Sequence, residues 1–293
     1  MSMQNSSLAM PFETASPMFN APISKTSRPA VFAGDLYPAD PVVLTSQIDA
    51  ALEVAAKDTP SKPQGKVRVM IMPYGPFQHS LSVLAKGYQR LSGERYDTVV
   101  LISPSVNPFN KLAISGYGFF DTPLGKVEIN DFIRNEYCDE DDDFFISEDG
   151  VPKGSSIEIQ LPFLIRTIGQ QSPFTIVPIL VGNQSIDLCN ETASVTSEIL
   201  QGRNALVIAI NNFFTPNANH PEIEQAVEML TDLNYGALLR FAGIHQKEFG
   251  SGLGVMAVAA RVAHEMSAKN FELIEKKGIA ELGQTYLAGT FSR

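Results

Sequence analysis

The sequence predicts an α/β protein with a largely parallel central sheet flanked by helices, and with antiparallel additions at the edge and C-terminus. Two observations support this fold class. Short, continuous apolar runs such as 67–72 and 205–210 have the length and composition of strands buried on both faces. Segments with helical periodicity separate these runs, and alternating βα order is typical of parallel sheets covered by helices.

The first predicted helix spans about 41–56, where Asp40 precedes Pro41 as an N-cap and Leu44 and Ile48 begin an apolar face. A polar linker at 59–66 then leads into the strand at 67–72. The alternation continues with a helix carrying Leu81, Leu84, Tyr88 and Leu91, a strand at 98–102, a helix around 157–168, a strand at 175–180, a helix at 186–200 and a strand at 205–210.

Two weaker strands, 112–120 and 126–129, flank the loop that ends in Leu-Gly125 and are predicted to pair antiparallel at one edge. The last third is predicted to contain three helices and a final strand pair: helices near 222–233, 235–246 and 255–266, and strands near 271–275 and 285–291. Because no repeat and no second linker interrupts this order, we predict a single domain over 28–293, preceded by an extended or disordered arm over 1–27.

Charge and composition exclude several classes of protein. The formal net charge of −10, without any basic run interleaved with aromatic residues, makes nucleic acid an unlikely partner. No segment reaches the roughly 18 uninterrupted apolar residues of a membrane span, so no membrane insertion is predicted. Cys138 and Cys189 lack CxxC spacing and fit a reducing compartment, which predicts a cytoplasmic protein. The acidic run 136–143 reads as a solvated loop.

Ligands of open α/β sheets collect beyond the carboxyl ends of parallel strands, because the connecting loops converge there. Four predicted loops lie at such ends: 73–80, 103–109, 182–185 and 211–217. Their residues therefore decide which chemistry the protein can perform.

Four segments taken together resemble the Memo family, which is related in fold to the class III extradiol dioxygenases. They are RPAVFAGDLYPAD at 28–40, TPLG at 122–125, SIEIQLPFL at 156–164 and IVPILVG at 176–182. The resemblance covers roughly residues 28–293. It implies an α/β sandwich around a central sheet, with a cleft at the four loops.

The metal ligands that the resemblance implies are replaced in this chain. Tyr74 stands where the family motif Pro-His-Ala-Gly has a His ligand, and Ser251 stands where Cys-Gly-x-Gly has a Cys ligand. The motif Gly-Pro-Ser-His-His matches 103–107, so that Ser105 is kept while Val106 or Asn107 replaces the second ligand. These residues are poor ligands for iron, copper or zinc, so we predict no metal and no cofactor.

The family's acid–base residues are replaced as well. Glu-His-Ser-Leu-Glu matches 154–158, where Ser155 replaces the His and Glu158 is kept. Ser-Asp-Phe-Ser-His matches 211–215, which places Asn211 and Asn212 at the Ser-Asp positions and Thr215 at the His position. The expected cleft is therefore polar and uncharged, since amides and hydroxyls do not titrate near neutral pH.

Two hypotheses of function follow. The first is a catalytically silent protein, a pseudoenzyme, that acts in protein interaction or assembly. The alternative is a metal-free enzyme or small-molecule binder that uses the same cleft, with Glu158 or His79 as the base. A Glu at a helix start is also stabilised by the helix dipole, and an isolated His is usually structural, so both residues keep a structural interpretation too.

The arm over 1–27 carries apolar residues among Ser, Asn and Pro, without any helical or strand periodicity. These residues are Met1, Met3, Met10, Phe12, Met18 and Phe19. A disordered tail is one interpretation, because termini are often unordered. Methionine side chains adapt well to irregular apolar grooves, so we predict instead that the arm extends across a neighbouring subunit or another protein partner.

Overall fold

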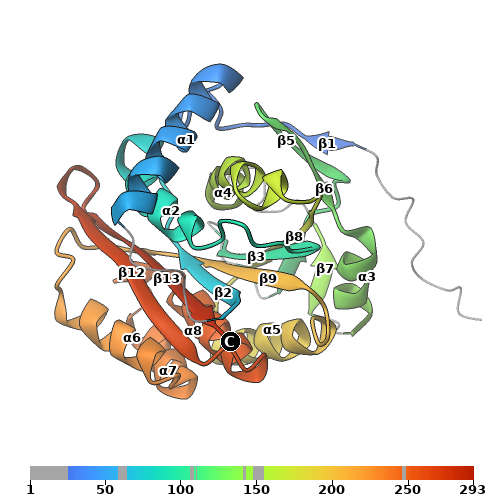
Figure 1. Cartoon of the computed structure of the whole chain (residues 1–293). Coiled ribbons are helices and arrows are strands. Elements are labelled where there is room, and N and C mark those ends of the chain that lie inside the picture. Colours follow the sequence, from blue (N-terminus) through green and yellow to red (C-terminus); the bar gives the residue numbers. More distant parts are fainter. Residues whose placement is uncertain are drawn as a thin grey trace, which may run out of the picture.

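A computed structural model describes residues 26–58, 65–105, 109, 111–140, 143–147, 155–245 and 249–293, with Ser155 and Ser251 described by their backbone only. Within these ranges the chain forms one twisted sheet with helices on both faces (Figure 1). The predicted α/β class, with a mostly parallel sheet, is confirmed.

The centre of the sheet consists of parallel strands in the order β6, β8, β3, β9, β2. Their bounds are Gly125–Ile129, Thr175–Val181, Thr98–Pro104, Ala205–Ile210 and Val67–Met72. All residues of β3 are buried. Side chains of β2 alternate between two cores: Val69 and Ile71 lie in one, while Met70 and Met72 lie in the other. Burial on both faces explains why the strands read as continuous apolar runs.

Antiparallel strands extend this centre. β13 (Gln284–Ser292) lies beside β2 and pairs along its length with β12 (Asn270–Ile279). β5 (Phe119–Thr122) forms a hairpin with β6, and β1 (Ser27–Arg28) adds to β5. The short strands β10 (Asn212–Phe213) and β11 (Gly250–Ser251) continue beyond β13.

The predicted pairing of 112–120 with 126–129 holds only in part. Phe119–Thr122 pairs with β6, whereas β4 (Leu112–Ile114) pairs antiparallel with β8 and parallel with β7 (Phe144–Ile146). β4 therefore packs against the carboxyl end of β8 and does not extend the hairpin.

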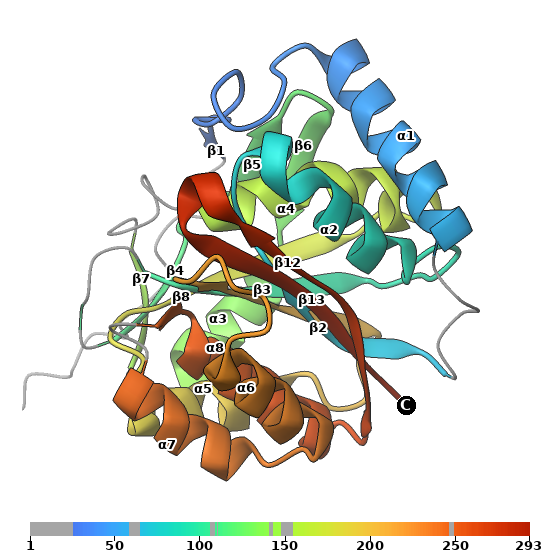
Figure 2. The ribbon, with the colours of Figure 1, turned by 90° about the vertical axis from the view of Figure 1, so that its left-hand side faces the viewer.

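Helices cover both faces of the sheet, as Figures 1 and 2 show. One face carries α1 (Pro41–Asp58), α2 (Phe77–Gln89) and α4 (Ser155–Arg166). The opposite face carries α3 (Asp131–Glu140), α5 (Ile186–Ile199), α6 (Pro221–Thr231), α7 (Tyr235–His245) and α8 (Leu253–Glu265). Among the described helices, none has both the length and the apolar composition needed to span a membrane.

The described chain begins at Thr26, two residues before the predicted domain boundary at 28, and β1 follows at once. The backbone carbonyl of Thr26 accepts a hydrogen bond from the Gly118 N–H at 3.0 Å, and Arg28 pairs with Phe120 in the sheet. The rest of the predicted arm, residues 1–25, lies outside the described residues.

Candidate functional site

The carboxyl ends of β2, β3, β8 and β9 meet at one edge of the sheet, where ligands of open α/β sheets usually bind. Tyr74 follows β2, Ser105 follows β3, and Asn211 follows β9. The turn before α8 reaches the same edge. A Cβ added to Gly252, whose φ is +89°, would lie 3.0 Å from Asn211 Cβ. The loop at 182–185 reaches this edge too, because the Val255 N–H donates to Gln184 Oε1 at 3.3 Å and a Cβ added to Gly182 would lie 2.0 Å from the Phe109 carbonyl oxygen. The structure thus brings residues of all four predicted loops to one edge, with the 251–254 turn.

Asn212 joins two of these loops through its side-chain amide. The Tyr74 N–H donates to Asn212 Oδ1 at 3.2 Å, and Asn212 Nδ2 donates to the Tyr74 carbonyl at 2.6 Å. Nδ2 also lies 3.3 Å from Gln284 Oε1, and Asn212 is opposite Ser251 in the β10–β11 register. The amide is buried and both of its polar ends are used, so it fixes the loop after β2.

Asn211 is buried on the α8 side of the same edge. Its backbone N–H donates to the Met72 carbonyl at 3.0 Å, and its Nδ2 lies 2.7 Å from Met256 Sδ. Its Oδ1 has no hydrogen-bond partner among the described residues. A neutral amide is less costly here than a carboxylate, because an unpaired charge would be desolvated.

Tyr286 of β13 belongs to the site, although the sequence did not single it out. Its buried hydroxyl lies directly under Gly75, since a Cβ added to that glycine would come within 2.0 Å of the hydroxyl oxygen. Burial, together with Tyr74, raises the pKa of Tyr286 to about 12. The hydroxyl has no partner in the described part of the chain. The one sequence signal was Gly75 itself, because such glycines often mark a close approach.

The other predicted cleft positions are less closely tied to this cluster. The Ser105 N–H donates to the Val181 carbonyl at 2.9 Å, which extends the β3–β8 pairing. Thr215 is half-buried, and its carbonyl accepts from Thr285 Oγ1 at 2.7 Å. Ser155 is the first residue of α4 and Ser251 lies in β11, both placed by backbone alone. Val106 and Asn107 lie outside the described residues.

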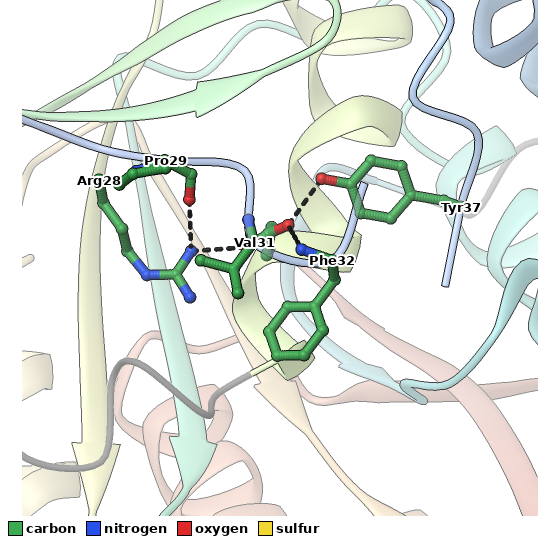
Figure 3. Close-up of polar contacts among 6 residues, drawn as sticks. Arg28, Pro29, Val31, Phe32 and Tyr37 are labelled. Atoms are coloured by element: carbon green, nitrogen blue, oxygen red, sulfur yellow. Dashed lines mark hydrogen bonds and ion pairs between the residues drawn. The ribbon is translucent and has the colours of Figure 1, made fainter. Parts of the chain in front are cut away.

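Glu158 is fully buried in α4 and accepts four hydrogen bonds from residues 28–37 (Figure 3). The donors are Arg28 Nη1 at 2.6 Å, the Val31 N–H at 3.2 Å, the Phe32 N–H at 2.8 Å and the Tyr37 hydroxyl at 2.7 Å. Burial and the Glu158 carboxylate raise the pKa of Tyr37 far above its ordinary value. Both carboxylate oxygens are therefore engaged, and these contacts assign Glu158 the role of an anchor for the segment that precedes α1.

His79 lies in the first turn of α2, half-buried, in a groove between α1 and α2. Neither Glu158 nor Tyr74 is among the described residues that line this groove. The two candidate bases therefore do not face a common cavity in the described part of the molecule.

The residues at the sheet edge do not fit the metal that the family resemblance implies. The side-chain amide of Asn212 is hydrogen-bonded to the Tyr74 backbone, and burial raises the pKa of Tyr286, so its phenol is a neutral donor near neutral pH. Across the described ranges there is no group of three or more His, Cys, Asp or Glu residues able to hold a metal ion.

The fold and this edge define an α/β protein whose candidate site is a neutral, hydrogen-bonded cluster at the ends of parallel strands. Residues 28–278 match the family described as Memo-like protein, and the chain belongs to that family. The resemblance seen in the sequence is thereby confirmed.

Relatives described as MEMO1 family proteins match over most of their length. The protein of Sulfolobus acidocaldarius is 30% identical over 260 residues, which cover 84% of this chain and 90% of that protein. The protein of Pyrobaculum arsenaticum is 27% identical over 269 residues, covering 86% and 91%. The protein of Nitrosopumilus maritimus is 22% identical over 257 residues, covering 84% and 90%.

Proposed function

We propose that this chain is a catalytically silent Memo-like protein that acts through protein contacts or self-assembly, with a neutral polar cleft in place of a metal site. The observation that carries the proposal is the pair of hydrogen bonds between Asn212 and the Tyr74 backbone, 3.2 and 2.6 Å long. Where the family resemblance implies an Asp, this residue is an amide that holds a loop in place. It cannot exchange a proton near neutral pH.

The contacts of Glu158 support the same proposal. A general base needs a free oxygen within hydrogen-bond reach of the substrate proton. Glu158 is buried, and its carboxylate oxygens accept hydrogen bonds from Arg28, Tyr37 and two backbone N–H groups. The residue that the family motif retains thus serves the stability of the fold.

We also propose a cytoplasmic location. Cys138 and Cys189 are both free, and burial raises the pKa of the Cys189 thiol to about 12. Free, unreactive thiols fit a reducing compartment. The proposed partner is a protein or a second copy of this chain, reached through the arm over 1–27. The acidic net charge disfavours nucleic acid.

Metal analysis of the full chain tests catalytic silence. Protein purified after incubation with ferrous iron, copper or zinc is expected to retain substoichiometric metal. A variant that combines Tyr74→His, Asn107→His and Ser251→Cys restores the implied ligand types and serves as the positive control. Stoichiometric metal in the natural chain, lowered by Tyr74→Phe, would overturn the proposal.

Small-molecule binding at the same edge is the second candidate function. Asn211 Oδ1 and the Tyr286 hydroxyl are buried there without partners among the described residues, and such groups gain from a bound polar molecule or water. A compound that raises the melting temperature of the natural chain, and fails to do so for Tyr286→Phe, would favour this function.

A further inference from the structure

A groove with a volume of about 1030 Å³ is lined by residues of α1 and α2. The two helices lie side by side on one face of the sheet (Figure 2). The walls of the groove come from the segment 34–38, from one face of α1 and from one face of α2, and Lys277 of β12 closes one end. This volume is at the upper limit of pockets for small ligands, about 300–1,000 Å³, and suits a chain segment.

Between Gln47 and Asp58, the α1 wall of the groove consists of apolar residues, and two of these are exposed. Leu44 and Ile48 bury the opposite face of this helix in the core, whereas Ala55 is buried and lines the groove. Ala50 and Val54, four residues apart and so on one face, remain exposed, and Val54 keeps 56% of its surface accessible. Helices usually place polar residues on their outer face, so this apolar face indicates a covering partner.

The groove carries little net charge. Asp35 and Asp58 contribute two negative charges, and Lys86 and Lys277 contribute two positive charges. Lys86 already forms an ion pair with Glu275. An almost uncharged apolar segment is therefore more complementary to this groove than a phosphate or an acidic peptide.

Residues 1–25 supply such a segment, and they lie outside the described residues. Glu13 is the only charged side chain among residues 1–24. Met10, Phe12, Met18 and Phe19 provide apolar anchors of the kind that fill irregular grooves.

The arm joins the fold at β1, and a buried carboxylate connects β1 to the groove. Arg28 and Tyr37 bind the same carboxylate of Glu158, and Tyr37 lines the groove. A chain of 25 residues spans up to about 80 Å when extended, which is ample for reaching a neighbouring copy. The Glu158 carboxylate thus links the start of the described chain to the groove, and arms of this length allow two copies to exchange them about a two-fold axis.

We propose that the α1–α2 groove of one copy binds residues 8–19 of a second copy. This inference rests on the proposed function, namely self-assembly through the arm. It adds the surface to which the arm binds. Val54 and Ala50 are the expected contacts for the Met and Phe side chains.

Light scattering on the full chain tests this inference with two charge substitutions on the same helix. Val54→Glu places a carboxylate in the groove and is expected to convert a dimer to a monomer. Val42→Glu is the matched control, because Val42 is 75% exposed and is not among the described lining residues. It is expected to leave the dimer intact. Circular dichroism verifies that both variants fold.

Peptide binding provides the second measurement. A labelled peptide of residues 8–20 is expected to bind saturably to protein lacking residues 2–24. Val54→Glu should weaken this binding at least about tenfold, while Val42→Glu leaves it unchanged.

The possible outcomes distinguish binding of the arm in the groove from binding of the arm at another place. If removal of residues 2–24 dissociates the dimer, but Val54→Glu neither dissociates it nor weakens the peptide, the arm acts elsewhere and the groove is refuted. If the natural chain is a monomer and only the truncated protein binds the peptide, each arm fills its own groove, which refutes the second copy as occupant. A monomer that binds no peptide in either form refutes both the inference and self-assembly through the arm.

Discussion

At the level of single residues, the most deeply buried ion pair described is that between Arg28 and Glu158, 2.6 Å apart. Both side chains are almost completely buried, and the Arg28 guanidinium also lies 5.0 Å from the centre of the Phe120 ring. Removing one partner of a buried pair leaves an uncompensated charge, which costs more than the pair itself contributes. The pair therefore determines how firmly the segment before α1 is attached.

Glu158→Gln is expected to lower the free energy of unfolding by about 3–5 kcal/mol, because Arg28 would remain buried without a counter-charge. The matched control is Asp49→Asn, which breaks the partly exposed ion pair with Arg166 and should cost at most about 1 kcal/mol. Urea denaturation of both variants measures the difference. Equal losses would show that the buried carboxylate is not an anchor.

Tyr286→Phe is expected to leave stability at neutral pH unchanged or slightly higher, since the removed hydroxyl has no described partner. The folded pKa of about 12 exceeds the ordinary value of 10.0, so this phenol favours folding below pH 10 and loses that contribution between pH 10 and 12. Between pH 10 and 12, the free energy of unfolding of the variant should fall by about 2–3 kcal/mol less than that of the natural chain. Parallel pH curves in urea denaturation would contradict the prediction.

At the level of elements, α4 holds the ends of two central strands. Gln160 Nε2 donates to the Pro73 carbonyl at 2.9 Å while its Oε1 accepts from the Tyr88 hydroxyl at 2.8 Å. Ser156 and Ser103 share a hydrogen bond of 2.7 Å at the end of β3. These contacts place the loop after β2, with Gly75, over β13.

Gly75→Ala should destabilise the protein by about 1–3 kcal/mol, because the new Cβ would overlap the Tyr286 hydroxyl. Combining it with Tyr286→Phe should recover part of the loss, and a double-mutant cycle of unfolding free energies measures the coupling. The control Gly243→Ala lies in α7, where an added Cβ meets no atom within 4 Å, and should be neutral or stabilising. If the two substitutions change the free energy of unfolding additively, the overlap with the Tyr286 hydroxyl is not the cause of the destabilisation.

Strands were predicted correctly from the sequence where the apolar pattern of a single segment was sufficient. The runs at 67–72 and 205–210 are β2 and β9 with the predicted bounds. Prediction failed for 112–120, where Leu112–Ile114 pairs with β8. An apolar run indicates that a strand is buried. Which strand it pairs with depends on packing against strands that are distant in the sequence.

At the level of the whole molecule, the C-terminal strand lies within the sheet. β13 pairs with β2, and the backbone N–H of Arg293 donates to the Lys66 carbonyl at 3.0 Å. The last third of the chain therefore cannot unfold without exposing a central strand.

We expect one cooperative unfolding transition, because the described strands share one sheet. Far-ultraviolet and near-ultraviolet circular dichroism should give the same urea midpoint. Two separated transitions would instead indicate two domains and would contradict the predicted single domain over 28–293.

The sequence by itself determined the fold class and the family resemblance, because apolar periodicity and residue type are local properties of the chain. Tertiary structure alone decided what the remaining polar groups do. Glu158 meets Phe32 across 126 positions, and Asn212 meets Tyr74 across 138. Contacts at such separations depend on how the elements pack, which no periodicity encodes. The anchoring of Glu158, the loop held by Asn212 and the Tyr286 hydroxyl beneath Gly75 could therefore be found only in the folded molecule.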